Sequence, residues 1–435
     1  MRRPHGRAGV RGVAVRILAR VERGAFADRL LEAALPALTD PRDRALLTEL
    51  VYGTLRWQGR LDHVLSHFAK RPLRTLHPEV RAALRLAAYQ LRHLDRIPAH
   101  AAVDEAVEHV KRVAQGAAGF ANALLRRVAT EGRNVPLPAD PIERLAVETS
   151  HPRWMVEREV AAHGAWEAAR RLGADASPAP LVLRAREGVE RLLGRLAAAG
   201  VTARPGRAAS DAVVIEPGAL PPGGVTALPG FAEGAFAVQD EASQLVTRLV
   251  DPKAGARVLD LCAAPGGKTG HLADLVGPEG HVVALDVDPA RLGRVRETVA
   301  RLGVADRVTV AVHDATTPLP APLAGPYDAV LVDAPCSGLG VVRRNPDILW
   351  RRRPEDVPPL AATQRAILEV AAPAVRPGGR LVYSVCTTTV EEGPGVVEGF
   401  LAAHPEYEAE ARLVTHPADG GLDGFFVQRM RRLAR

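Results

Sequence analysis

The sequence predicts a multi-domain protein with an all-helical N-terminal domain, a small α/β middle segment and a C-terminal α/β domain built on a parallel, doubly wound sheet. Two observations predict this order. Apolar residues recur at helical spacing from about residue 10 to 130, and strand-like apolar runs alternate with helical stretches from about residue 255 onward. A chain of 435 residues is also too long for one ordinary hydrophobic core. We therefore expect domains at residues 1–135, 142–240 and 241–435.

The first domain is expected to be helical because its amphipathic segments carry few strand signals, as in PRDRALLTELVYGTLRWQGRLDHVLSHF and AAVDEAVEHVKRV. Proline is favoured in the first turn of a helix, so His77-Pro78 and Ile97-Pro98 mark two helix starts. The polar, proline-containing run EGRNVPLPADP at 131–141 predicts a linker.

The middle segment mixes the two periodicities. PRWMVEREVAAHG predicts a helix, PLVLRA a strand, VERLLGRLAAAG a helix that ends at Gly200, and VTARP and AVVIEP two short strands. These signals predict a small α/β domain.

The last domain contains five apolar runs: RVLDLC, HVVALDVD, RVTVAVHD, YDAVLVDAPC and GRLVYSVC. Helical stretches such as ARLGRVRETVARLG separate them, which is typical of parallel strands with crossover helices. The final DGFFVQRMRRL is expected to add an antiparallel edge strand.

The amino-acid composition predicts the cellular compartment more clearly than it predicts the kind of ligand. Lys+Arg exceed Asp+Glu by 57 to 50, and only four of these basic residues are lysine. Arginine suits contacts with phosphates and bases, although an arginine-rich solvated surface accounts for the same surplus. Three cysteines do not make a disulfide framework, and no uncharged apolar run of 18 residues occurs. We expect a cytoplasmic protein without a membrane segment.

Acids or cysteines stand where each apolar run stops. Because ligands bind at the carboxyl ends of parallel strands, these residues are expected at one edge of the sheet. A single acid at such a place is commonly a helix cap, but four in succession favour a ligand site. The residues are Asp260 with Cys262, Asp286, Asp314, Asp333 with Cys336, and Cys386.

The first turn, CAAPGGKT, ends like a phosphate-binding loop. That loop requires a glycine where Cys262 stands, and a dinucleotide loop would read G-x-G-x-x-G. Gly266 and Gly267 still allow close approach of the backbone to a ligand, and Asp286 is placed for ribose hydroxyls. The pattern suits adenosine without pyrophosphate, and S-adenosylmethionine is the natural candidate.

The cysteines extend this hypothesis. Carbon 5 of a pyrimidine is a poor nucleophile, so its methylation requires a thiolate to add at carbon 6 first. Cys336 in DAPCSG and Cys386 in YSVCT are both candidates, while an inert buried thiol is the usual role of a single cysteine.

Four segments, CAAPGGKT, DAPCSGLGVVRRNPDILWRR, YSVCTTTVEE and DGFF, resemble in this order the motifs of the RNA 5-methylcytosine methyltransferase family, over about residues 145–435. The first domain resembles the NusB-like fold through PAHAAVDEAVEHVKR and GFANALLRRV. The combination is similar to bacterial methyltransferases of a cytosine in small-subunit (16S) ribosomal RNA. This resemblance implies an RRM-like middle domain and a Rossmann-like methyltransferase domain.

The resemblance also implies roles for particular residues. Cys386 would be the nucleophile, Cys336 would assist product release, and Asp333 would lie near the polar edge of the cytosine. Val385 departs from the family, which usually has threonine before its nucleophile. S-adenosylmethionine would be held by Cys262, Ala263, Ala264, Pro265, Gly266, Gly267, Lys268, Asp286, Asp314 and Asp333.

RNA is the expected partner, most directly small-subunit ribosomal RNA, with no metal and a monomeric state. Near Trp350 a run of arginines would clamp phosphates while Trp350 stacks on a base, or else Trp350 packs inside a solvated charged segment. The arginines near the N-terminus would bind RNA or solvate a helix. These two sets are Arg343, Arg344, Arg351, Arg352 and Arg353, and Arg2, Arg3, Arg7, Arg11 and Arg16.

Four other functions stay open at this point. One is methylation of cytosine in transfer RNA or another RNA, and another is a non-enzymatic RNA-binding regulator with a relict catalytic domain. A DNA cytosine-5 methyltransferase would use Cys336 as its nucleophile, but no large recognition region follows that loop. An ATPase is disfavoured by Cys262.

Overall fold

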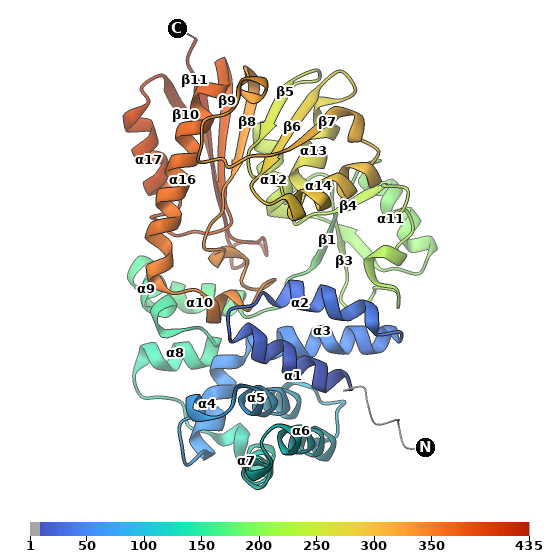
Figure 1. Cartoon of the computed structure of the whole chain (residues 1–435), viewed down its shortest axis with the longest axis vertical. Helices are drawn as coiled ribbons and strands as arrows, with labels where there is room; N and C mark the ends of the chain where they lie inside the picture. Colours follow the sequence, from blue (N-terminus) through green and yellow to red (C-terminus); the bar gives the residue numbers. More distant parts are fainter. Residues whose placement is uncertain (1–8, 435) are drawn as a thin grey trace. The chain divides into compact units, whose positions relative to one another are not determined.

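The computed structural model describes residues 9–434, so Arg2, Arg3 and Arg7 lie outside the described part of the chain. It divides into two compact units, one formed by residues up to 178 together with 342–352 and the other by 179–341 together with 353–435 (Figure 1). The domain boundaries expected at 135–142 and 240–241 stay a prediction.

The first unit is helical, as predicted. Its core is formed mainly by aliphatic side chains of α1 and α3 to α7. Helix α5 begins at Pro78 as expected, whereas Pro98 is the N-cap of α6, which begins one residue later. The helices are α1 (Val10–Val21), α2 (Ala27–Ala34), α3 (Pro41–Arg56), α4 (Gln58–Phe68), α5 (Pro78–His93), α6 (Ala99–Val113), α7 (Ala118–Glu131), α8 (Pro141–Thr149), α9 (Arg153–His163) and α10 (Ala165–Asp175).

The segment 342–352, which follows the Cys336 loop in sequence, folds with these helices. It contains the short helix α15 (Ile348–Arg351). The Trp350 indole N–H donates to the Leu55 carbonyl at 2.6 Å, and Arg56 donates to the Arg343 carbonyl at 2.9 Å.

The second unit begins with a four-stranded antiparallel sheet of order β2-β3-β1-β4. Helix α11 packs on this sheet through Leu192 and Leu196, and the turn after it reaches Gly200, whose φ of +74° is readily adopted only by glycine. The elements are β1 (Leu181–Ala185), α11 (Val189–Ala198), β2 (Ala203–Pro205), β3 (Ala212–Ile215) and β4 (Phe236–Val238).

The larger sheet of this unit has seven strands in the order β10-β11-β9-β8-β5-β6-β7. The five strands from β9 to β7 are mutually parallel, which confirms the doubly wound class. Its elements are α12 (Glu241–Val250), β5 (Arg257–Asp260), α13 (Gly267–Val276), β6 (His281–Asp286), α14 (Pro289–Arg301), β7 (Val308–Val312), β8 (Tyr327–Asp333), α16 (Val357–Ala371), β9 (Val375–Val385), α17 (Pro394–Ala403), β10 (Tyr407–Thr415) and β11 (Phe425–Arg432).

The expected C-terminal edge strand needs a correction. Strand β11 is antiparallel to its neighbours, but it lies between β9 and β10, so β10 forms the edge. The alternating and largely polar segment of β10 gives a weak strand signal on its own, and its pairing with β11 makes it a strand.

Helices cover both faces of the large sheet (Figure 1). Side chains alternate along each strand, so Val330 and Val332 of β8 pack toward α16 and α17, whereas Ala329 and Leu331 pack toward α12, α13 and α14. This two-sided burial leaves the strand ends as the places where polar side chains gather.

The small sheet is joined to the large one by a buried ion-pair cluster. Arg184, whose side chain is 3% exposed, contacts Asp274 of α13 at 2.8 Å, and Arg186 contacts the other carboxylate oxygen at 2.6 Å. A carboxylate between two guanidinium groups offsets the cost of burying Arg184.

Candidate active site

The sequence-predicted residues lie along the carboxyl edge of the five parallel strands. Cys386 follows β9, Asp333 ends β8, Asp260 ends β5, and Asp286 ends β6. Asp314 comes two residues after β7. Because these strands are neighbours in the sheet, residues from distant parts of the sequence share one edge.

The turn after β5 is fixed against β6 and α14. Asp286 accepts a hydrogen bond from the Ala264 amide at 3.2 Å, and Arg291 donates to the Ala264 carbonyl at 3.0 Å. Gly266 has φ +103°, and a Cβ there would lie 3.0 Å from the Cα of Val295. Helix α13 begins at the next residue, so the turn presents the backbone amides of a helix N-terminus to a ligand.

Asp260 is completely buried beneath this turn. One carboxylate oxygen accepts a hydrogen bond from the Thr269 hydroxyl at 2.7 Å, and the other has no hydrogen-bond partner within the described residues. Burial raises the pKa of Asp260 to about 7, although the Thr269 hydrogen bond acts to lower it.

Lys268 and Asp333 form an ion pair with an N–O distance of 2.6 Å. Burial acts to lower the pKa of Lys268, but the charge and hydrogen bond of Asp333 outweigh it, so the pKa is raised. The ammonium group also lies 5.3 Å from the ring centre of Phe425. Lys268 therefore neutralises Asp333 at this edge.

The two acids after β6 and β7 differ in their surroundings. Asp286 is buried and accepts amide hydrogen bonds from Ala264 and Asp288. Asp314 is exposed, and hydrogen bonds from the Thr316 amide and hydroxyl lower its pKa. An ionised Asp314 at the open end of the sheet remains able to accept from a ligand.

The sulfur atoms of Cys336 and Cys386 lie 3.2 Å apart. The hydrogen bond to Cys386, followed by burial, raises the pKa of Cys336 well above its ordinary value, so Cys336 keeps its proton at neutral pH. Burial and the nearby acids raise the pKa of Cys262. The structure thus brings two of the three thiols together and leaves Cys262 as a half-buried thiol of the first turn.

Val385, the departure from the family pattern, is fully buried in the sheet opposite Phe426. Its side chain belongs to the apolar core that includes Tyr383. The hydroxyl of Thr387, the residue after Cys386, lies 3.2 Å from the hydroxyl of Ser337, the residue after Cys336.

Sequence reasoning missed a buried polar cluster behind the two cysteines, formed by Gln364, Tyr383 and Glu392. All three side chains are fully buried. Glu392 stands within the quoted motif YSVCTTTVEE, but nothing in its spacing distinguishes it from an exposed acid.

Trp350 is packed rather than free to stack on a base. Its ring lies against the core of the helical unit, where a Cβ added at Gly59 would meet it at 3.0 Å. Arg351 contacts Asp347 at 3.0 Å and lies over the ring of Phe26. The packed interpretation therefore holds for Trp350.

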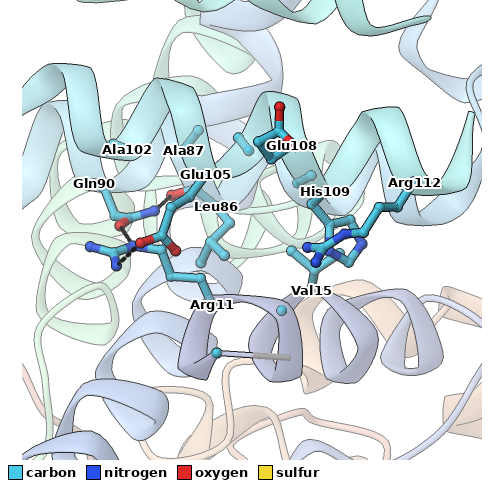
Figure 2. Close-up of a pocket in the computed structure, with 14 residues that line it drawn as sticks. Arg11, Val15, Leu86, Ala87, Gln90, Ala102, Glu105, Glu108, His109 and Arg112 are labelled. Carbon is cyan, nitrogen blue, oxygen red and sulfur yellow. Dashed lines mark hydrogen bonds and ion pairs between the residues drawn. The ribbon is translucent and has the colours of Figure 1, made fainter. Parts of the chain in front are cut away.

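A cavity of about 280 Å³ lies between α1, α5 and α6 of the helical unit (Figure 2). Figure 2 shows Arg11 at one end, where it donates to Gln90 at 2.6 Å and to Glu105 at 3.0 Å, while His109 and Arg112 lie at the other end. Arg11 is thus engaged within its own domain, whereas Arg16 is exposed.

Across residues 9–434 no group of three or more His, Cys, Asp or Glu side chains has the arrangement of a metal site. Within the same range no helix is both long and apolar enough to cross a membrane.

The doubly wound sheet, with acids and thiols at its carboxyl edge, defines a Rossmann-like methyltransferase domain. Comparison with models of known protein families identifies the family of this chain. Residues 247–430 match the 16S rRNA methyltransferase RsmB/F family, residues 9–130 the NusB family, and residues 151–219 the ferredoxin-like domain of RsmF/B-like methyltransferases. The chain belongs to the RsmB/F methyltransferase family.

Individual relatives are similar in sequence to this chain over almost its full length. The chain is 37% identical to the probable ribosomal RNA small subunit methyltransferase B of Bacillus subtilis, over 98% of this chain and 99% of the relative. It is 36% identical to ribosomal RNA small subunit methyltransferase B of Pseudomonas putida, over 93% of this chain and 94% of the relative. The crystal structure of PH0851 is similar with a TM-score of 0.82 and 27% identity, covering 98% of this chain and all of that one.

Proposed function

We propose that this protein transfers a methyl group from S-adenosylmethionine to carbon 5 of a cytosine in small-subunit ribosomal RNA, through a covalent bond between Cys386 and carbon 6. The observation that carries the proposal is the pair of thiols 3.2 Å apart beside the acids of the carboxyl edge. Methylation of an exocyclic amine would need no thiol at this place.

The residues of the edge fit S-adenosylmethionine. The bound cofactor would supply an electrophilic methyl carbon on a positively charged sulfur. The backbone of residues 262–268 would hold it together with the carboxylates of Asp286, Asp314 and Asp333. The unpartnered oxygen of Asp260 provides a further buried acceptor for a polar hydrogen.

Cys386 would begin the reaction by forming a bond from its sulfur to carbon 6, which moves the electrons of the ring double bond to carbon 5. Carbon 5 would then take the methyl group as the bond from that carbon to the sulfonium sulfur breaks, and the sulfur would keep the electron pair and become neutral. Cys336 supports this role of Cys386, because a neighbour that keeps its proton donates a hydrogen bond to the attacking sulfur. Asp333 would contact the polar edge of the cytosine and promote the addition.

Release would depend on Cys336. Once Cys386 is bonded to carbon 6, its sulfur loses its charge and most of its capacity to accept a hydrogen bond. The two effects of Cys386 that raise the pKa of Cys336 then disappear, and Cys336 ionises more easily. It would take the proton from carbon 5, the ring double bond would reform, and the bond from carbon 6 to Cys386 would break.

Ribosomal RNA is the proposed substrate because the relatives that match almost the whole chain are named small subunit rRNA methyltransferases. The NusB-like unit would contribute RNA contacts, and a cytoplasmic monomer is the proposed state.

The test is incubation with labelled S-adenosylmethionine and 16S ribosomal RNA, with transfer RNA and DNA as alternative substrates. Cys386→Ala is expected to abolish label transfer. Cys336→Ala is expected to leave a protein–RNA complex that persists in a denaturing gel. A trapped complex with Cys386→Ala instead would exchange the two roles, and label in transfer RNA or DNA alone would refute the proposed substrate.

A further inference from the structure

The two cysteines come from different loops, yet their sulfurs lie in contact. Cys336 follows β8 in the segment Pro335–Ser337, and Cys386 follows β9 directly. The thiols are 50 residues apart in the chain. Whatever fixes these two loops against each other also fixes the geometry of the pair.

Glu392 contacts both loops. Its Oε1 accepts hydrogen bonds from the Ser337 amide at 2.8 Å and from the Gln364 side-chain amide at 3.0 Å. Its Oε2 accepts from the Thr389 hydroxyl at 3.0 Å. The first bond holds the residue after Cys336, and the last holds the loop three residues after Cys386.

Gln364 and Tyr383 complete this arrangement. Gln364 of α16 also donates to the Pro335 carbonyl at 2.9 Å, so the residues on both sides of Cys336 are held. Its side-chain oxygen accepts from the Tyr383 hydroxyl at 3.0 Å, and that hydroxyl also lies 2.5 Å from the Glu392 carbonyl. The Glu392 carboxylate has no solvent exposure and accepts hydrogen bonds from three donors. Its role is therefore inside this site and not at the protein surface.

We infer that Glu392 is a positioning residue of the two-cysteine site, whose carboxylate fixes the loops of Cys336 and Cys386 in the relation that methyl transfer requires. The inference rests on the proposed function for its catalytic consequence. The hydrogen bonds of the Glu392 carboxylate go to Ser337, Gln364 and Thr389, so it acts through the two loops. Its negative charge also faces Cys336 and contributes to raising the pKa of that thiol.

The experiment compares Glu392→Ala and Glu392→Gln in the full chain, with Glu398→Gln as the control. Glu398 is an exposed acid of α17, six residues away. Alanine removes the carboxylate that accepts from the Ser337 amide and the Gln364 amide. Glutamine keeps an oxygen for these two donors, and the Thr389 hydroxyl can turn to accept from the new amide group.

Glu392→Ala is expected to lower methyl transfer by about 10²-fold, the effect of displacing reacting groups by roughly 1 Å. Glu392→Gln should lose about tenfold less, because its acceptor geometry is kept. Glu398→Gln should match the wild type. Wild-type rates for a correctly folded Glu392→Ala protein would overturn the inference.

A second readout does not depend on catalysis. Phenylarsine oxide reacts with two neighbouring thiols to form two As–S bonds and release water, so it reports how close Cys336 and Cys386 lie. Cys336→Ala removes one thiol and gives the baseline. Glu392→Ala should weaken this binding by about tenfold or more, since a chelate is lost when its two groups no longer face each other. Unchanged binding would show that Glu392 does not set the geometry.

The third readout is the pH dependence of Cys336 alkylation by iodoacetamide, followed by mass spectrometry. Loss of the negative charge in Glu392→Gln should move the midpoint for Cys336 to lower pH, which a purely structural role would not do. An unmoved midpoint would remove the electrostatic part of the inference.

The outcomes separate the two proposals. If the wild type transfers no label and Cys336→Ala traps no RNA, the proposed function fails, while arsenical binding and alkylation still decide the role of Glu392. If Glu392→Ala does not fold, as judged by circular dichroism, Gln364→Met tests the same arrangement. That change removes the donor to the Pro335 carbonyl with a side chain of similar length, and it should weaken arsenical binding in the same way.

Discussion

Asp260→Asn provides a test of the electrostatics beneath the cofactor turn. Asp260 ends β5, is completely buried, and has one carboxylate oxygen without a partner among the described residues. Burial raises its pKa from 3.8 to about 7. Asparagine has the same shape and keeps an oxygen for Thr269, but it does not titrate.

The sign follows from proton binding. Between about pH 4 and pH 7 the folded protein holds a proton on Asp260 that the unfolded chain has released, so the stability of the second unit falls as pH rises and levels off above pH 7. A shift of about 3 pH units corresponds to roughly 4 kcal/mol. The stability of Asp260→Asn relative to the wild type should therefore increase by about 1.4 kcal/mol per pH unit across this window.

The assay must follow the second unit specifically. All four tryptophans, at positions 57, 154, 166 and 350, belong to the first unit. Hydrogen exchange of peptides from β5, β6 and β8 in urea, corrected for the pH dependence of amide exchange, reports the free energy of unfolding of the second unit. Tryptophan fluorescence then serves as an internal control that should not change.

Asp306→Asn is the matched control, because the Asp306 side chain is 73% exposed in the same unit. Its stability relative to the wild type should vary little with pH. A difference for Asp260→Asn that stays constant from pH 4 to 7, or that falls with rising pH, would refute the reasoning.

Two further predictions concern stability. Asp274→Ala leaves the buried Arg184 without its carboxylate, and the free energy of unfolding of the second unit, measured by hydrogen exchange, should fall by about 3–5 kcal/mol. The control is Glu297→Ala, at an exposed site of α14. An equal loss in both variants would contradict the role of the ion pair. Trp350→Phe leaves the Leu55 carbonyl without its indole donor, and the first unit should lose about 1–3 kcal/mol by urea unfolding followed through the remaining tryptophans. Trp166→Phe, whose side chain is 78% exposed, should lose little, and a stable Trp350→Phe protein would return Trp350 to the surface interpretation.

The sequence by itself determined the fold class, because helical and strand periodicities are local properties of the chain. The five parallel strands follow from apolar runs separated by helical stretches, and the first turn follows from CAAPGGKT. The sequence also placed acids and cysteines where strands stop. Which sheet edge they share then followed from the general rule for parallel strands.

Only the tertiary structure decided how these residues contact one another. The thiol separation depends on β8 and β9 being neighbours, and the role of Glu392 depends on partners 28 and 55 residues away. No local pattern encodes such contacts. The same limit applies to β10, which is a strand only because β11 pairs with it, and to residues 342–352, whose apolar side chains pack with helices formed some 290 residues earlier in the chain.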